Sequence, residues 1–368
     1  MYDVCIIGAG PAGSTLARTI GSRYRVLLVD RRSLDRPWSP GDVSKPCGGL
    51  LAPRAQAELA RQGLGLPRGV VSGPQLFAVR TLDFEASFER LYQRFYVSVD
   101  REGLDRWLVS LVPDAVDTAF GWRADAIDES GDVPLVHFKT PGGGHASVEA
   151  RLVVGADGAA SLARSAAVSP SRAPKRYTAV QSVFSAAWTE PYYGAVFDRR
   201  LTDFYGWTIP RGDALVVGAA FPSGPGTGDR FDAFVAGLRE RGFGLGDERS
   251  RMSAPIARPS SPLEVAFGTR DIALVGEAAG LISPSSAEGI SYALRSGAAL
   301  GSALGQGLVG ALDRYRLAAL PLAAEVSGKL LKSSVIYTPA SRWLVMKTGL
   351  GAIHRADAGF RAHPAPAA

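Results

Sequence analysis

Three glycines and an acid near the N-terminus are spaced to bind a dinucleotide. Gly8, Gly10 and Gly13 follow the apolar run at residues 4–7, and Asp30 ends the next apolar run. The first glycine allows a tight turn, the second lets backbone N–H groups approach a pyrophosphate, and the third lets the following helix pack closely on the strand. Asp30 then lies where a carboxylate can accept hydrogen bonds from ribose hydroxyls. This order of strand, glycine turn, helix, strand and acid predicts a bound dinucleotide rather than a plain strand–helix turn.

Two later glycine turns also follow short apolar runs. Asp157-Gly158 comes directly after one such run, and Gly276-Glu277 comes after another. The carboxyl ends of parallel strands in a doubly wound sheet meet along one edge, and ligands bind there. The sequence therefore predicts an α/β fold in which distant segments converge on one ligand site.

The segments between these turns divide the chain into predicted domains. Residues 176–222 are rich in aromatic and β-branched side chains, which favours a sheet, and the chain ends in a run of Pro and Ala. We assign 1–73, 97–168 and 265–310 to a discontinuous Rossmann-like binding domain, 74–96 and 169–264 to an antiparallel-sheet substrate domain, and 311–368 to a C-terminal helical segment with a loose tail.

Local patterns predict the elements that position the turns. Pro53 begins a helix that stops at Gly63, and Asp100 caps a helix with a regular apolar stripe. Residues 133–154 read as a hairpin that turns at a Pro-Gly-Gly-Gly sequence. The last of the predicted core helices begins near Ser286.

Composition limits the classes of protein that this chain can represent. Its 368 residues are 46% hydrophobic and 21% charged, which suits a globular protein with two cores. The net charge is +6, but the basic residues are mostly scattered Arg and form no nucleic-acid-binding motif, so we expect no nucleic-acid partner. Residues 311–368 hold eight Lys or Arg against three acids. A basic helical surface can make weak peripheral contact with anionic lipid, but a solvated helical face is the favoured explanation.

The remaining signals concern cellular location and metals. Cys5 and Cys47 give no disulfide framework, which suits a reducing compartment. The first strand begins near residue 2, and no run of 18 strongly apolar residues exists, so we expect a soluble cytoplasmic protein. The four His residues lack metal-ligand spacing, so we assign no metal. The sequence leaves the oligomeric state open.

Taken together, the three glycine turns resemble the fingerprints of flavoproteins with the para-hydroxybenzoate hydroxylase fold. In that group a dinucleotide motif, a "DG" motif and a "GD" motif occur in this order. The resemblance implies FAD, with Asp30 on the adenosine ribose and Arg101 near the pyrophosphate and ribityl chain. Glu277 stands where the group has Asp, and its longer side chain can still accept hydrogen bonds from ribityl hydroxyls.

Two further segments resemble geranylgeranyl reductases. Lys45-Pro46-Cys47-Gly48-Gly49 is similar to their "CGG" loop, and residues 204–210 are similar to their Y-x-W-x-F-P motif, with Ile209 in place of Phe. The continuation to Pro53 is closer still to the CbrA-like bacterial branch. The resemblance implies an aromatic-lined cavity and reduction of isolated C=C bonds in apolar, isoprenoid chains. The aromatic motif also resembles that of flavin-dependent halogenases, but the context of Lys45 and the chain length favour the reductases.

These resemblances imply specific roles for residues. Cys47 is the candidate catalytic group, because a thiol above the flavin could supply or relay the proton that alkene reduction needs; the alternative is a small residue that lets the loop pack closely. Lys45 is assigned either to a phosphate group or to a solvated loop. The residues assigned to FAD are Gly8, Gly10, Pro11, Ala12, Gly13, Asp30, Arg31, Lys45, Cys47, Arg101, Asp157, Gly158, Gly276, Glu277, Gly289 and Ile290. Those assigned to the substrate are Tyr205, Trp207 and Pro210.

Three functions follow from this reading of the sequence. The first is an FAD-dependent oxidoreductase of the geranylgeranyl reductase type acting on an apolar small molecule. The second is a flavin-dependent monooxygenase on the same scaffold, and the third is a non-catalytic FAD-bound maturation or sensor protein. No second G-x-G-x-x-G follows a strand, so an electron donor such as NAD(P)H would bind transiently.

Overall fold

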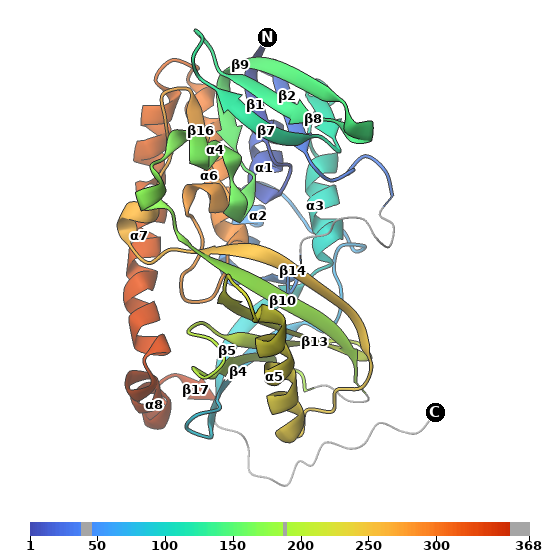
Figure 1. The fold of residues 1–368 in the computed structure, drawn as a ribbon, viewed down its shortest axis with the longest axis vertical. Helices are drawn as coiled ribbons and strands as arrows, with labels where there is room; N and C mark the ends of the chain where they lie inside the picture. The colour runs from blue at the N-terminus through green and yellow to red at the C-terminus, as the bar shows by residue number, and fades with distance from the viewer. Residues whose placement is uncertain (38–45, 187–189, 354–368) are drawn as a thin grey trace.

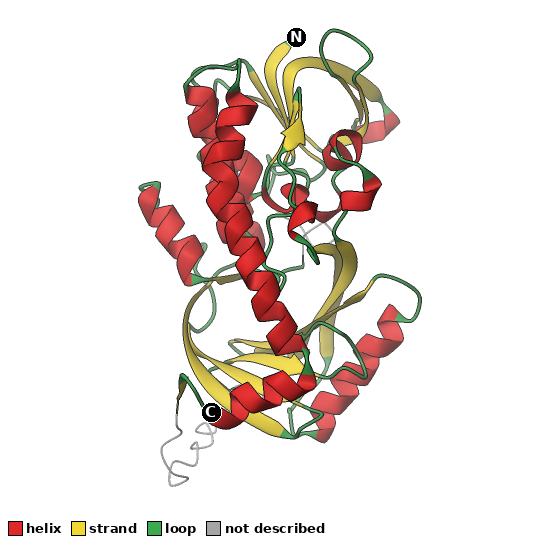
Figure 2. Cartoon of the chain, turned by 90° about the vertical axis from the view of Figure 1, so that its left-hand side faces the viewer, coloured by secondary structure: helices red, strands yellow, loops and turns green. Residues whose placement is uncertain are grey.

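The chain folds around two sheets that share one set of C-terminal helices. The computed structural model describes residues 1–37, 46–186 and 190–353. A mainly parallel sheet forms one end of the molecule, and a curled, mainly antiparallel sheet forms the other (Figure 1). The helix α7 (Ala311–Tyr337) runs along one side past both sheets, as Figure 2 also shows. The predicted α/β class, with its Rossmann-like and antiparallel parts, is confirmed.

The first sheet brings the three glycine turns to one edge. Its central strand β1 (Tyr2–Ile7) pairs in parallel with β2 (Val26–Asp30) and β9 (His145–Gly155). The strand β16 (Ile272–Leu274) pairs in parallel with the other side of β9. The described strands of this sheet follow the order β15 (Gly268–Thr269), β16, β9, β1, β2 and β6 (Asp117–Phe120), with β7 (Arg123–Asp128) and β8 (Leu135–Lys139) attached beside β9.

Burial explains why these strands read as continuous apolar runs. Val4, Ile6 and Leu28 are fully buried because helices and loops cover both faces of a parallel sheet. The helices α1 (Pro11–Ile20) and α6 (Ile290–Gly305) pack closely on one another. The other helices near this sheet and its cavity are α2 (Pro53–Arg61), α3 (Arg101–Ser110) and α4 (Leu162–Ala167).

The second sheet forms the wall of the predicted substrate domain. Its described strands follow the order β14 (Glu248–Arg258), β10 (Lys175–Ser185), β13 (Ala214–Pro222), β12 (Gly206–Arg211), β11 (Tyr193–Phe197), β4 (Leu76–Asp83), β5 (Phe88–Ser98) and β17 (Ala352–Ile353), with β3 (Leu50–Leu51) beside β5. The pairs are antiparallel except for β11 with β4. The helix α5 (Thr227–Glu240) buries Phe231, Phe234 and Leu238 against one side of this sheet.

The structure corrects one predicted boundary. The sequence places a helix start near Ser286, whereas α6 begins at Ile290. Ala287 has a φ of +52°, a left-handed conformation that cannot continue a helix, and its N–H bonds to the carbonyl of Ser283 in a separate turn. The cavity is therefore bordered by an irregular loop as well as by the helix start.

The C-terminal segment is tied to the second sheet. The helix α8 (Pro339–Thr348) carries Arg342, which is 3% exposed and whose Nε lies 2.7 Å from Asp83 Oδ2 on β4. The short strand β17 then adds to β5, a pairing that the sequence did not predict. Within the described ranges, no helix combines the length and the apolar character needed to cross a membrane.

Candidate functional site

The first glycine turn has one position that leaves space for a ligand. Gly8 has a φ of +108°, and a Cβ there would lie 2.4 Å from the carbonyl oxygen of Ala156. A Cβ on Gly13 would lie 1.8 Å from the carbonyl oxygen of Gly8. These two glycines are required by contacts within the protein. A Cβ on Gly10, by contrast, would meet no protein atom within 4 Å, and Gly10 lines the cavity. Its small size is explained by a group that approaches the backbone from the cavity.

Asp30 lies beside this turn but is already shared with an arginine. Its carboxylate accepts hydrogen bonds from the N–H groups of Ala9 and Arg32, each at 2.8 Å. Arg32 Nε also lies 3.1 Å from Asp30, and its guanidinium bonds to Asp105 at 2.8 Å. Burial alone would lower the pKa of Arg32, but Asp105 and Asp30 together raise it. Arg32 is thus fixed as a cation at the glycine-turn end of the cavity.

Arg101 lies next to this cluster. Its guanidinium bonds to Asp105 at 2.5 Å, and it lines the cavity. Arg31 also lines the cavity but is exposed. Arg31 was predicted to bind the cofactor, and Arg32 was not. The two residues are neighbours in the sequence, and only the course of the chain after β2 shows that Arg32 is the one that contacts Asp30.

Asp157 organises the second turn. Its carboxylate accepts hydrogen bonds from the hydroxyl of Ser161, the N-cap residue of α4, at 2.5 Å and from the N–H of Leu162, the first residue of α4, at 2.7 Å. Burial raises the pKa of Asp157. Gly158, which has a φ of +77°, faces the cavity. Asp157 therefore shapes the backbone of the turn, and its side chain is already engaged within the protein.

Glu277 in the third turn links the two sheets. The preceding Gly276 has a φ of +60°, and a Cβ there would lie 3.2 Å from the Cβ of Ala12 on α1. The Glu277 carboxylate accepts a hydrogen bond at 2.9 Å from the N–H of Ala257 on β14. The extra methylene relative to Asp lets this side chain reach the second sheet from the floor of the cavity.

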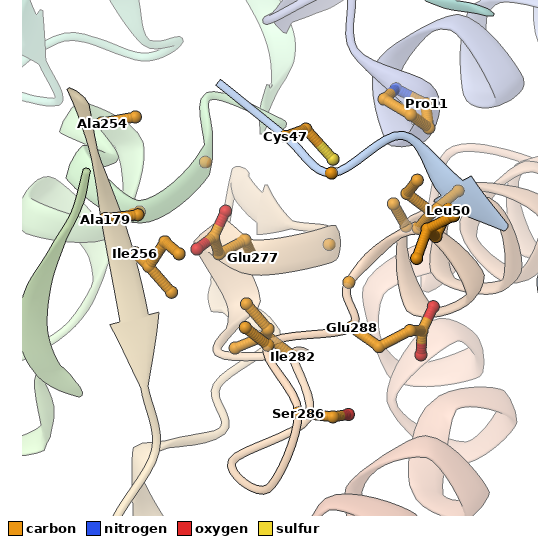
Figure 3. A pocket seen from close by; sticks show the side chains of 18 of the residues that line it. Pro11, Cys47, Leu50, Ala179, Ala254, Ile256, Glu277, Ile282, Ser286 and Glu288 are labelled. Carbon is orange, nitrogen blue, oxygen red and sulfur yellow. The ribbon is translucent and has the colours of Figure 1, made fainter. Parts of the chain in front are cut away.

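The start of α6 presents backbone groups to the cavity. Gly289 is the N-cap residue, and both Gly289 and Ile290 line the cavity. The Glu288 carboxylate accepts hydrogen bonds at 2.8 Å from the N–H and from the hydroxyl of Ser291. The carboxylate is therefore bound to the first turn of α6. In Figure 3 it points away from Glu277. The positive end of the helix dipole can still act on a ligand at Gly289.

The Cys47 loop crosses the cavity between the two sheets. Cys47 is partly exposed and lines the cavity, and in Figure 3 its loop passes above Glu277 and Ile282. The loop is packed against the second sheet, because a Cβ on Gly48 would lie 2.4 Å from Cδ1 of Ile209. The neighbouring Lys45 falls outside the described residues.

Aromatic side chains form the far wall. Tyr205 and Trp207 line the cavity, with ring centroids 5.7 Å apart, and Ile209 continues the same face. This agrees with the period of two along an extended chain. Pro210 is buried on the opposite side of β12, so the structure places the predicted substrate residue Pro210 away from the cavity and Ile209 in it.

Polar groups on this wall are few and hydrogen-bonded. Trp207 Nε1 donates to Gln181 Oε1 at 3.3 Å, and Gln181 Nε2 lies 3.5 Å from the carbonyl oxygen of Cys47. The hydroxyl of Tyr193 donates to that of Tyr205 at 3.1 Å, which in turn donates to the Ser286 carbonyl at 2.8 Å. Gln181 and Tyr193 were missed by the sequence analysis, because neither belongs to a recognisable motif.

One cavity joins all these parts. Its volume is about 1620 Å³, and its lining runs from Gly8 and Asp30, past the Cys47 loop, to Tyr205 and Trp207. Pockets for a single small ligand are typically about 300–1,000 Å³, so this one has room for a large cofactor together with a substrate. The open space at Gly10, directly before the start of α1, fits a dinucleotide.

Comparison with known proteins agrees with this geometry. No protein-family model matches the chain. Protein CbrA of Escherichia coli is 36% identical over 352 residues, which cover 96% of this chain and 94% of that protein. A geranylgeranyl bacteriochlorophyll reductase-like protein from Thermoplasma acidophilum superposes with a TM-score of 0.77 at 19% identity, covering 93% of this chain and 89% of that one.

A second solved structure shares the fold. PqsL of Pseudomonas aeruginosa, described as a probable FAD-dependent monooxygenase, has a TM-score of 0.68 at 19% identity and covers 94% of this chain and 99% of its own. Both structural matches show a common fold, and the CbrA match shows common descent along nearly the whole length. The chain therefore belongs to the CbrA family and has the fold of FAD-dependent oxidoreductase structures.

Proposed function

We propose that this protein is an FAD-dependent oxidoreductase that reduces an apolar, isoprenoid-type substrate. The observation that carries this proposal is the continuous cavity, which has glycine turns at one end and an aromatic, apolar wall at the other. The Cys47 loop lies between the two ends. A cofactor held at the first end would meet a substrate held at the second beneath this loop.

The glycine-turn end supplies the binding groups for FAD. The open backbone at Gly10 suits the pyrophosphate, and Asp30 suits the adenosine ribose. Arg101 and Arg32 add positive charge near the phosphates, and the start of α6 at Gly289 suits the flavin ring. FAD bound here would supply hydride transfer, while the protein supplies position and electrostatics.

The aromatic end supplies a dry site for an apolar chain. Tyr205, Trp207 and Ile209 are each less than a tenth exposed, and their apolar surfaces line the cavity. Excluding water from this region protects a reduced cofactor from side reactions. Cys47 lines the cavity between the two ends, and we assign to its thiol the delivery of a proton to the substrate carbon that does not receive the hydride.

The electron donor is proposed to be NAD(P)H or another carrier that binds transiently. The sequence contains no second dinucleotide motif after a strand, so a donor would use the open cavity rather than a domain of its own.

A monooxygenase is the second candidate, because the fold is shared with PqsL at a TM-score of 0.68. In that case the product would carry one added oxygen atom. The proposed reductase would instead add two hydrogen atoms across one C=C bond. A non-catalytic FAD-bound protein would do neither.

Product mass separates these candidates. The purified protein is reconstituted with FAD, reduced chemically without oxygen, and incubated with a short polyprenol. A gain of two hydrogen atoms that depends on the protein supports the reductase. A gain of one oxygen atom after admission of air supports the monooxygenase, and a colourless protein that cannot be reconstituted contradicts both.

A further inference from the structure

The C-terminal end of the chain exposes an unusual number of large apolar side chains. They lie on the last turns of α7, on α8, and around β17, which follow one another in the chain and pack together beside β5. Large exposed apolar patches mark sites of interaction. We call this surface the C-terminal face; its members are Leu331, Val335, Trp343, Leu344, Val345, Leu350 and Ile353.

In α8 the exposed apolar residues are not the edge of a buried apolar stripe. Its buried residues are Arg342 and Met346. Trp343, Leu344 and Val345 are consecutive and all exposed, so they spread over roughly 200° of the helix circumference at about 100° per residue. A surface helix normally buries its apolar stripe against the core. This helix turns more apolar surface outward than inward.

The cations of the face that are not ion-paired are few but lie close to its apolar side chains. Residues 326–353 contain four Lys or Arg and no Asp or Glu, but Arg342 is buried against Asp83 and Lys329 is paired with Glu325, which leaves Lys332 and Lys347. Lys347 Nζ lies 4.5 Å from the centre of the Trp343 ring. Arg94 on β5 and Lys332 on α7 have no ion-pair partner within the described ranges, and burial, with Arg94 and Lys329 nearby, lowers the pKa of Lys332.

The face borders the mouth of the cavity. Val335 and Val345 belong to the face and also line the cavity, together with Lys332 and Arg94. In Figures 1 and 2, α8 lies at the end of the molecule formed by the second sheet, away from the glycine turns. The apolar half of the cavity therefore opens within an apolar, positively charged surface.

We propose that the C-terminal face docks on an anionic lipid bilayer, so that the cavity opens toward the membrane. Apolar side chains flanked by Lys and Arg are the combination that binds the interface of anionic membranes. A symmetric contact with a second copy would instead set like charges against each other. The docking is inferred from the exposed side chains of the C-terminal face alone. The entry of an apolar substrate from the lipid rests on the proposed function.

The test is flotation of the full-length, FAD-reconstituted protein with lipid vesicles. One set of vesicles is phosphatidylcholine, and the other is an equimolar mixture of phosphatidylcholine and phosphatidylglycerol. The apolar variant is Leu331→Ser with Leu344→Ser. Its matched control is Leu317→Ser, because Leu317 lies on the same helix as Leu331 and is 70% exposed against 74%, but lies outside the face.

The proposal expects binding to the anionic vesicles only, and a loss of about tenfold or more in the apolar variant. Lys332→Gln combined with Lys347→Gln should weaken binding to the anionic vesicles by about fivefold for each charge removed. Added salt should weaken the binding of the parent protein to the same vesicles. Leu317→Ser should bind like the parent. Equal binding to neutral vesicles, no binding, or equal loss in Leu317→Ser would overturn the docking surface.

Two further readouts keep the outcomes distinct. Light scattering measures whether the protein is a dimer. If the parent is a dimer, the apolar variant is a monomer and neither binds vesicles, the face contacts a second copy and the proposal is overturned. Flavin content and turnover of detergent-dissolved polyprenol are measured on the same samples. Because vesicle binding needs neither reaction nor substrate, its failure and the failure of the proposed function are observed separately.

Discussion

The two ends of the cavity are built in different ways. At the glycine turns, backbone atoms form the surface, and contacts within the protein dictate Gly8 and Gly13. At the aromatic wall, side chains form the surface: Trp207 lies on β12, Tyr205 directly precedes that strand, and Tyr193 lies on β11. The first end is shaped mainly by the backbone, with charged side chains such as Asp30 beside it, whereas the second is shaped by side chains.

This difference separates cofactor binding from substrate choice. Substitutions on the wall can reshape the space for a substrate without moving the glycine turns, since the two ends belong to different sheets. Glu277 and the Cys47 loop are the exceptions, because each touches both parts. Substitutions at either end, and at these links, test how independent the ends are.

The largest effect is expected for Gly10→Leu at the glycine turns. The new side chain would fill the space that we assign to the pyrophosphate, so the purified protein should contain no flavin. Because no protein atom lies within 4 Å of that Cβ, the free energy of unfolding of the apoprotein should change by less than about 0.5 kcal/mol. The ratio of flavin to protein absorbance and denaturant unfolding measure the two quantities.

The control for this substitution is Gly13→Ala. Its Cβ would overlap the Gly8 carbonyl, so it should lose folding stability as well as flavin. A yellow Gly10→Leu protein with normal flavin occupancy would show that the cofactor does not lie at this turn.

Cys47→Ala tests the loop between the two ends. The flavin content should stay normal, because the thiol is not required for binding, while turnover should fall by about 100-fold through loss of the proton donor. Cys5→Ala is the control, since burial raises the pKa of the Cys5 thiol to about 12 and keeps it inert. Its turnover per bound flavin should match the parent. Unchanged turnover in Cys47→Ala would remove the proposed role of the thiol.

Glu277→Asp tests the link between the sheets. The shorter side chain should no longer reach the Ala257 N–H, which would leave a buried donor unsatisfied and lower the free energy of unfolding by about 2 kcal/mol. Glu277→Gln keeps the length and an acceptor oxygen, so it should restore most of this stability. Equal unfolding energies for the parent and the Asp variant would show that this hydrogen bond contributes nothing to the fold.

The sequence predicted the glycine-turn end well because its signals are local. A turn with fixed glycine spacing depends on neighbouring residues, and the placement of the three turns on adjacent strands follows from the rules of parallel sheets. The family and the fold are confirmed for the same reason. Errors arose where one residue altered the local course of the chain, as Ala287 does before α6.

The aromatic end was only partly predictable. Tyr205 and Trp207 were found through a motif, and the same alternation along the strand would have selected Ile209 rather than Pro210. Tyr193 reaches the cavity, and Gln181 reaches Trp207 and the Cys47 carbonyl, through pairing between distant strands, which leaves no local signal. The addition of β17 to β5 depends on residues more than 250 positions apart in the same way.

The smallest effect is expected for Tyr193→Phe on the aromatic wall. Burial raises the pKa of Tyr193 well above its usual value, so the phenol stays protonated at assay pH. Removing its hydroxyl deletes one hydrogen bond to Tyr205, which keeps its own bond to the Ser286 carbonyl, so the free energy of unfolding should fall by only about 1 kcal/mol. Turnover should stay close to that of the parent, as measured under the conditions used for Cys47→Ala. A loss of turnover as large as that of Cys47→Ala would instead assign the proton to the phenol, and the wall would then take part in chemistry rather than only enclose it.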